Sequence, residues 1–153
     1  MKNKEIDYII LGGGCSALSF ALELNKNNIY NYSFLIIESR ARYEDDRSWC
    51  FWQSKENSNK ELISKSWKDF SISFQGQKII HSSSQYQYHY IRSIDFYNYA
   101  MKFIKKSPNI NIILGERAVK ISNLKNKFLV QTDKKKYIAK NILDTRPKKN
   151  IYI

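Results

Sequence analysis

The chain has 153 residues, of which 42% are hydrophobic and 14% aromatic, which excludes an intrinsically disordered protein and fits one ordinary domain. No apolar run reaches the roughly 18 residues that a membrane-spanning helix needs. The net charge of +12 suggests an anionic partner. Because the lysines are scattered and no nucleic-acid-binding motif accompanies them, we expect no nucleic acid among the partners and favour attraction to anionic lipid. Two cysteines suggest no disulfide framework and a cytoplasmic location.

The N-terminal segment predicts a strand, a helix and a second strand. Residues 7–11 (DYIIL) are apolar after the initial Asp7, which favours a first strand of a parallel sheet over a signal peptide. Apolar residues at helical spacing then predict a helix to about Asn25. Residues 32–38 (YSFLIIE) predict a second buried strand that ends in an acid. Together these elements form a β-α-β unit whose two strands run parallel.

The segments that follow predict a hairpin, a helix and further strands. Residues 39–61 are expected to be mostly irregular, although their centre is dense in aromatic side chains. A hairpin is predicted around Gln75-Gly76, and a strand at residues 88–94. Asp95 is expected to cap a helix that ends before Pro108. Further strands are predicted at residues 109–114 and in the segments RAVKIS, KFLVQTD and KYIAKNILD.

The glycine-rich turn after the first strand carries the clearest functional signal. Strand, G-x-G-x-x-A and helix form the dinucleotide-binding fingerprint. Gly12 permits the tight turn, Gly14 lets a pyrophosphate approach the backbone, and Ala17 lets the helix pack closely on the strand. Glu38 ends the second strand about 20 residues later, where a carboxylate accepts hydrogen bonds from the adenosine ribose and disfavours a 2′-phosphate. The alternative is a glycine turn that binds no ligand.

The other residues of this turn are included in the predicted cofactor site. They are Gly13, Cys15 and Ser16. Gly13 needs no role beyond backbone freedom. Cys15 is interpreted as a small residue that faces the cofactor, with a redox-active thiolate at the helix start as the alternative. No His, Cys or Asp cluster has metal-ligand spacing, so we expect no metal and assign no role to His81 or His89.

These segments predict an α/β fold that contains a Rossmann-type dinucleotide-binding β-α-β unit and an antiparallel β segment.

Four segments resemble one known family. Residues 46–52 (DRSWCFW) resemble the DRTWCFW-type signature of the lycopene cyclase family of carotenoid flavoproteins. The segment IILGGGCSALSFALEL is similar to that family's GAGCAGLSLA segment. YHYIRSIDFY and ILDTRP are similar to its middle strand-to-helix segment and its DSRP segment. These matches span residues 9–147.

The resemblance implies a Rossmann-type FAD/NAD(P)-binding fold with an inserted antiparallel β segment. Residues 1–153 would then form an N-terminal dinucleotide-binding domain, within which a β-rich substrate region begins at about residues 66–94. It implies a flavoprotein that converts the ψ-ends of lycopene to β-ionone rings. An acid protonates the terminal double bond, the ring closes and a proton is lost, so the net reaction is an isomerisation. It implies reduced FAD, which stabilises the developing cation, and NAD(P)H as an electron source. The substrate is a carotenoid hydrocarbon dissolved in membrane, so the resemblance also implies a cytoplasmic protein that docks peripherally on a bilayer.

The resemblance also suggests roles for the aromatic segment. Arg47 would meet the pyrophosphate or brace its loop, with a surface ion pair to Asp45 or Asp46 as the alternative. Trp49, Phe51 and Trp52 would wall the flavin or the polyene, with ordinary core packing as the alternative.

The chain departs from the family in length. Family members are more than twice as long, and their second glycine segment and acidic motif are not found here, so the catalytic residue is unknown. We therefore expect a truncated form, a fragment or half of a split enzyme, with a C-terminal complementing chain as partner and weak or no FAD binding by itself. Two alternatives are an FAD/NAD-dependent oxidoreductase of isoprenoids and a non-catalytic, degenerate dinucleotide-fold binding module.

Overall fold

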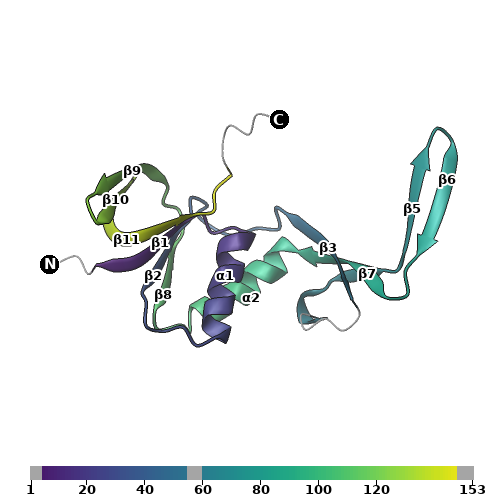
Figure 1. Ribbon diagram of the computed structural model, residues 1–153, viewed down its shortest axis with the longest axis horizontal. Helices are drawn as coiled ribbons and strands as arrows, with labels where there is room; N and C mark the ends of the chain where they lie inside the picture. Colours follow the sequence, from purple (N-terminus) through teal and green to yellow (C-terminus); the bar gives the residue numbers. More distant parts are fainter. Residues whose placement is uncertain (1–4, 55–59, 148–153) are drawn as a thin grey trace. The chain divides into compact units, whose positions relative to one another are not determined.

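The computed structural model describes residues 5–54 and 60–147 (Figure 1). The chain divides into two compact units: unit 1 comprises Met1–Arg42 and Tyr99–Ile153, and unit 2 comprises Tyr43–Asn98. Helix α2, Ser93–Ile104, contributes residues to both units. Unit 2 contains as many basic as acidic residues, so the whole net charge of +12 belongs to unit 1.

Unit 1 contains a six-stranded mixed sheet in the order β8-β2-β1-β11-β10-β9. β1 runs parallel to both β2 and β11, and β2 runs parallel to β8, whereas β9, β10 and β11 form an antiparallel meander. This topology confirms the predicted α/β fold and its parallel β-α-β unit. The strands are β1 (Ile6–Leu11), β2 (Phe34–Ile37), β8 (Ile110–Ile113), β9 (Ala118–Leu124), β10 (Lys127–Thr132) and β11 (Lys136–Asp144).

The core of unit 1 explains why its strands and first helix form. Helix α1, Cys15–Lys26, buries small and aliphatic residues at helical spacing. All four residues of β2 are buried, as expected for a strand covered on both faces. One continuous cluster joins the parallel strands to the meander and comprises Ile9, Leu11, Leu35, Ile37, Val130 and Ala139.

Asp7 fastens the start of β1 to its two neighbours. Its carboxylate accepts hydrogen bonds from the Ser33 backbone N–H at 2.8 Å, from Ser33 Oγ at 2.8 Å and from Lys140 Nζ at 2.7 Å. The bond from Lys140, supported by the bonds from Ser33, lowers the pKa of Asp7 from 3.8 to about 2. The ionised form is therefore favoured by folding.

We expect Asp7→Asn to lower the free energy of unfolding by about 1 kcal/mol at neutral pH, because the pair is partly exposed to solvent. The folded-state pKa lies below the unfolded value, so this contribution is present above about pH 4 and is lost as the pH falls toward about pH 2. Urea denaturation at a series of pH values measures it. An equal difference between wild type and variant at about pH 7 and about pH 2 would contradict this assignment.

Unit 2 contains a three-stranded antiparallel sheet in the order β3-β7-β4, with a single 3-10 turn at Lys60–Leu62. Its strands are β3 (Ser48–Ser54), β4 (Lys65–Trp67) and β7 (Tyr86–Arg92). The prediction that residues 39–61 are mostly irregular was therefore wrong for β3. In β3, exposed and half-buried residues alternate along SWCFWQ because the strand pairs along its whole length with β7.

The strand-to-helix junction after β7 also lies earlier than predicted. β7 ends at Arg92, and α2 begins at Ser93, so Asp95 lies in the first turn of the helix and Ile94 belongs to the helix. An acid in the first turn stabilises the helix through its dipole. The Ser93 hydroxyl is bound within the loop that precedes β3, which fixes the start of α2 two residues before the predicted cap.

The predicted hairpin is confirmed. β5 (Asp69–Phe74) and β6 (Gln77–Ser82) pair with each other as a separate two-stranded sheet, and every residue of both strands is exposed. The turn has positive φ at both Gln75 (46°) and Gly76 (80°), as two-residue hairpin turns require. One face of the hairpin carries Phe70, Ile72, Phe74 and Ile79. Among the described residues, no helix is long and apolar enough to cross a membrane.

Candidate functional site

Gly12 forms the turn between β1 and α1 in a conformation that other residues avoid. Its φ is +91°, and a Cβ added there would lie 3.1 Å from both Thr145 Oγ1 and Arg146 Cγ. Its N–H donates to the Ile37 carbonyl at 2.9 Å, which ties the turn to β2. The first glycine of the fingerprint is therefore required by backbone geometry and by close packing.

The segment after β11 holds this turn in place. Thr145 donates to the Leu11 carbonyl through both its N–H and its hydroxyl, each at 3.0 Å. The Arg146 guanidinium forms two bonds to Asp144, at 2.8 and 2.7 Å, and one to the Ala118 carbonyl at 3.2 Å. The DTR segment thus links β1, β9 and β11 at the carboxyl end of the parallel strands, where ligands bind in such sheets.

Gly14 leaves open space at the start of α1. A Cβ added at Gly14 would meet no atom within 4 Å. The first turn of α1 contains no acidic residue, and its N–H groups have no partner in the preceding helical turn. Ser16 is exposed, whereas Ala17 is fully buried, as expected of the residue that packs the helix on the sheet. This end of the helix fits an anionic group such as a pyrophosphate.

Cys15 begins the same helix. Its thiol is half-buried, and Sγ lies 3.9 Å from Ser19 Oγ, one turn along α1. Its orientation toward a cofactor stays a prediction.

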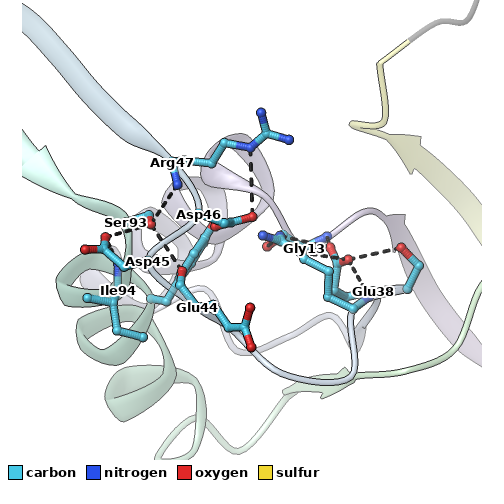
Figure 2. Close-up of polar contacts among 11 residues, drawn as sticks. Gly13, Glu38, Glu44, Asp45, Asp46, Arg47, Ser93 and Ile94 are labelled. Carbon is cyan, nitrogen blue, oxygen red and sulfur yellow. Dashed lines mark hydrogen bonds and ion pairs between the residues drawn. The ribbon is translucent and has the colours of Figure 1, made fainter.

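Glu38 is 5% exposed and lies beside the glycine turn. Its carboxylate accepts the Gly13 N–H at 2.6 Å and the Arg40 N–H at 2.8 Å (Figure 2). Arg40 Nε and Nη2 donate at 3.1 and 3.3 Å, and Ser39 Oγ donates at 3.2 Å. Burial raises the pKa of Glu38, but the bonds from Arg40 and Gly13 outweigh it and leave the pKa below its usual value. The carboxylate is therefore ionised at neutral pH.

A buried carboxylate supports Glu38 from within unit 1. The Glu116 N–H donates to the Glu38 carbonyl at 3.0 Å. The Glu116 side chain is 1% exposed and accepts bonds from Thr132 Oγ1 at 2.5 Å and from the Tyr137 hydroxyl at 2.9 Å. Burial raises the pKa of Tyr137 to about 12, and the hydrogen bond to Glu116 and the charge of Glu116 contribute to the increase. Sequence reasoning missed Glu116, because a single acid in a short loop gives no signal of burial.

The loop before β3 belongs to unit 2 and is held by α2. The Arg47 N–H donates to Ser93 Oγ at 3.1 Å, and the Ser93 hydroxyl donates to the Glu44 carbonyl at 3.2 Å (Figure 2). The Arg47 side chain is 72% exposed, with Nε 3.9 Å from Asp46 Oδ2. Arg47 therefore braces the loop through its backbone, and its guanidinium forms the surface ion pair that was the alternative interpretation.

The three aromatic residues proposed to wall the flavin or polyene do not form one wall. In the register with β7, Trp49 and Phe51 share one face of the sheet, and Trp52 lies on the other. Trp49 packs against Phe96 and Tyr97 of α2, with ring centroids 5.1 and 5.3 Å apart, as in ordinary core packing. A strand separates adjacent residues onto opposite faces, so Phe51 and Trp52 cannot line the same side of the sheet, and the lining roles stay predictions.

Trp52 has a different environment. It is 47% exposed, and its ring centroid lies 5.1 Å from that of Tyr88 and 5.1 Å from that of Phe70. Among the three proposed lining residues it presents the most accessible ring for an apolar ligand.

His89, to which the sequence analysis assigned no role, is a buried polar residue. It is 4% exposed, and Nδ1 lies 2.7 Å from Ser66 Oγ. Nε2 is buried and has no hydrogen-bond partner in the part of the chain that the structure describes. In residues 5–54 and 60–147 no group of three His, Cys, Asp or Glu residues is arranged to hold a metal ion.

Comparisons with solved structures show the same fold in longer chains. The p-nitrophenol 4-monooxygenase PnpA from Pseudomonas putida DLL-E4 is 14% identical, with a TM-score of 0.71 over 95% of this chain and 42% of that one. The halogenase PltM in complex with ethyl mercury and mercury is 13% identical, with a TM-score of 0.67 over 95% and 36%. A geranylgeranyl bacteriochlorophyll reductase-like protein from Thermoplasma acidophilum is 15% identical, with a TM-score of 0.61 over 90% and 38%. This chain thus spans less than half the length of each.

No curated protein matches the chain. A family model described as lycopene cyclase protein matches residues 7–151, which is nearly the whole sequence and includes the glycine turn, the aromatic segment and the DTR segment. The chain therefore belongs to the lycopene cyclase family.

Proposed function

We propose that this chain is the dinucleotide-binding part of a flavoprotein that converts the ψ-ends of lycopene to β-ionone rings. The family match over residues 7–151 supports the substrate and the reaction. The single structural observation that carries the cofactor site is the open space at Gly14, directly at the N-terminus of α1.

FAD is the proposed cofactor, and unit 1 offers the groups that its ADP half needs. The pyrophosphate would lie against Gly14 and the first N–H groups of α1, and the ribose would face Glu38. Two similar structures are described in complex with FAD, the monooxygenase PieE and the halogenase PltM. Reduced FAD would stabilise positive charge that develops on the polyene, with NAD(P)H as the proposed electron source.

The proposed reaction adds one proton to lycopene, closes a ring and removes another proton, so substrate and product have the same mass. We assign the protonating acid to none of the residues of this chain. Because lycopene dissolves in lipid, we propose a cytoplasmic protein that docks peripherally on the membrane. A C-terminal complementing polypeptide is the proposed partner, in keeping with the greater length of the similar structures.

A second candidate is a flavoprotein that reduces an isoprenoid. The similarity to the structure described as a geranylgeranyl bacteriochlorophyll reductase-like protein favours it. The two candidates differ in product mass: cyclisation leaves the mass of lycopene unchanged, whereas reduction adds two hydrogen atoms for each double bond.

The test is FAD retention by the chain, alone and co-expressed with the C-terminal portion of a full-length family member. We expect little FAD on the chain alone and a stoichiometric amount with the C-terminal portion. Gly14→Ala should weaken FAD binding, because the added methyl group enters the space proposed for the pyrophosphate. Glu23→Ala, which changes an exposed position of the same helix, is the control.

Released FAD is quantified by absorbance, and the loaded complex is then incubated with lycopene in vesicles. A cyclised product of unchanged mass supports the cyclase. Failure of every preparation to retain FAD, or equal retention by the Gly14 and Glu23 variants, would contradict the proposed cofactor site.

A further inference from the structure

The Glu38 carboxylate has no hydrogen-bonding capacity left for a ribose. A carboxylate offers about four lone-pair sites. In this structure Oε1 accepts from Arg40 N, Arg40 Nε and Ser39 Oγ, and Oε2 accepts from Gly13 N and Arg40 Nη2. The residue that should bind the adenosine ribose is therefore saturated by donors of its own chain.

The donors differ in how readily they can leave. The N–H groups of Gly13 and Arg40 belong to the backbone of the turn and of the residues after β2, and the fold keeps them in place. The Arg40 side chain is 30% exposed, whereas the Glu38 side chain is 7% exposed. Arg40 thus covers Glu38 from the solvent side. Its guanidinium, which also donates from Nη2 to the Gly13 carbonyl at 3.3 Å, is the charged side-chain donor on Glu38.

Departure of the Arg40 guanidinium would remove one donor from each carboxylate oxygen, Nε from Oε1 at 3.1 Å and Nη2 from Oε2 at 3.3 Å. Oε1 would keep two donors, the Arg40 N–H and the Ser39 hydroxyl, whereas Oε2 would keep only the Gly13 N–H. An adenosine ribose presents two neighbouring hydroxyl donors, the 2′-OH and the 3′-OH. The acceptor site released on Oε2 is therefore available to a ribose hydroxyl.

We propose that Arg40 competes with the ribose of the cofactor for Glu38 and so controls how strongly this site senses the 2′-hydroxyl. The inference rests on the proposed dinucleotide function of the same site. While Arg40 is paired with Glu38, binding the ribose exchanges one set of charge-assisted bonds for another, and little affinity is gained. Without Arg40, the ribose bonds form on a carboxylate that has free acceptors, and the full contribution of the 2′-hydroxyl is realised.

The test compares ADP with 2′-deoxy-ADP on the full chain, by NMR titration, for wild type, Arg40→Met and Arg42→Met. The ratio of the two dissociation constants cancels the general attraction of a basic protein for phosphates. We expect Arg40→Met to raise the preference for ADP over 2′-deoxy-ADP about tenfold relative to wild type, as the strength of charge-assisted bonds implies. Arg42 is exposed and its replacement removes the same charge, so that variant should keep the wild-type ratio.

Adding Glu38→Ala to the Arg40→Met variant should abolish the increased preference, because Glu38 is the proposed acceptor. In the wild type, the Arg40 Nε–H signal should shift toward its solvent-exposed position when ADP is added. An unchanged ratio in Arg40→Met, or a larger loss of affinity for ADP than for 2′-deoxy-ADP, would overturn the proposal while leaving the cofactor site intact. If no variant binds ADP at millimolar concentration, the inference is wrong, whereas the proposed cofactor site is judged by FAD retention in the co-expressed complex.

Discussion

Gly12→Ala is expected to destabilise the protein by about 3 kcal/mol. The new Cβ would force an unfavourable positive φ of +91° on an L-residue and would lie 3.1 Å from both Thr145 Oγ1 and Arg146 Cγ. Thr145 or Arg146 would have to move, and both form hydrogen bonds that hold this region together. Thr145 donates to the Leu11 carbonyl at the end of β1, and Arg146 donates to the Ala118 carbonyl of β9. Urea denaturation followed by far-UV circular dichroism measures the change.

Gly14→Ala is the matched control, because it makes the same chemical change two residues later. At Gly14 φ is −81°, and the added methyl would meet no atom within 4 Å. We expect its free energy of unfolding to stay within about 1 kcal/mol of the wild type, since alanine is only somewhat worse than glycine at a helix N-cap. ADP binding should nevertheless weaken, because the methyl enters the proposed pyrophosphate space. Equal destabilisation by the two variants would refute the division of roles between the glycines.

Glu116→Ala is expected to lower the free energy of unfolding by about 3 kcal/mol. The change leaves the Tyr137 hydroxyl without the acceptor that it reaches at 2.9 Å and opens a cavity at a side chain that is 1% exposed. Glu116→Gln keeps an oxygen acceptor and nearly the same volume, and should cost only about 1 kcal/mol. Denaturant unfolding curves of both variants provide the measurement.

A double-mutant cycle with Tyr137→Phe separates the bond from the cavity. If the hydroxyl and the carboxylate interact as described, the two single changes should be non-additive by about 1 kcal/mol. Glu23→Ala on the exposed face of α1 should change stability by less than about 0.5 kcal/mol. Strict additivity would contradict a stabilising bond between the Tyr137 hydroxyl and Glu116.

The sequence sufficed for the parts of the fold that are encoded locally. The β-α-β unit was predicted because a buried strand, a glycine turn and an amphipathic helix each show their own period within a few residues. The hairpin of β5 and β6 was predicted to the residue, since the Gln75-Gly76 turn fixes its register.

Elements that depend on distant partners were not predicted. β3 was expected to be irregular, and it is a strand because β7, more than 30 residues away, pairs with it from Ser48 to Ser54. The same pairing decides which face each aromatic residue occupies, so Trp49 and Trp52 point to opposite sides. The sequence shows that this segment is unusually rich in aromatic residues. Which face of the sheet each side chain occupies depends on the pairing of β3 with β7.

The same distinction between local and long-range signals applies to the residues of the candidate site. Gly12, Gly14 and Glu38 were identified because the fingerprint places them at fixed offsets. Arg40 was missed although it lies only two residues after Glu38, and an arginine that close to the predicted ribose acid was the available signal. Thr145 and Glu116 reach the site across more than 70 residues of sequence, and their contacts follow from sheet order alone.

The exposed hairpin has a consequence for the behaviour of the protein at high concentration. The segment FSISF of β5 has strong β-propensity and carries neither charge nor proline, and both edges of its two-stranded sheet present unpaired backbone groups. The positive charge of unit 1 keeps molecules apart at long range, but salt screens it beyond about 10 Å. We therefore expect aggregation to begin by edge-to-edge pairing at β5 and to increase with ionic strength.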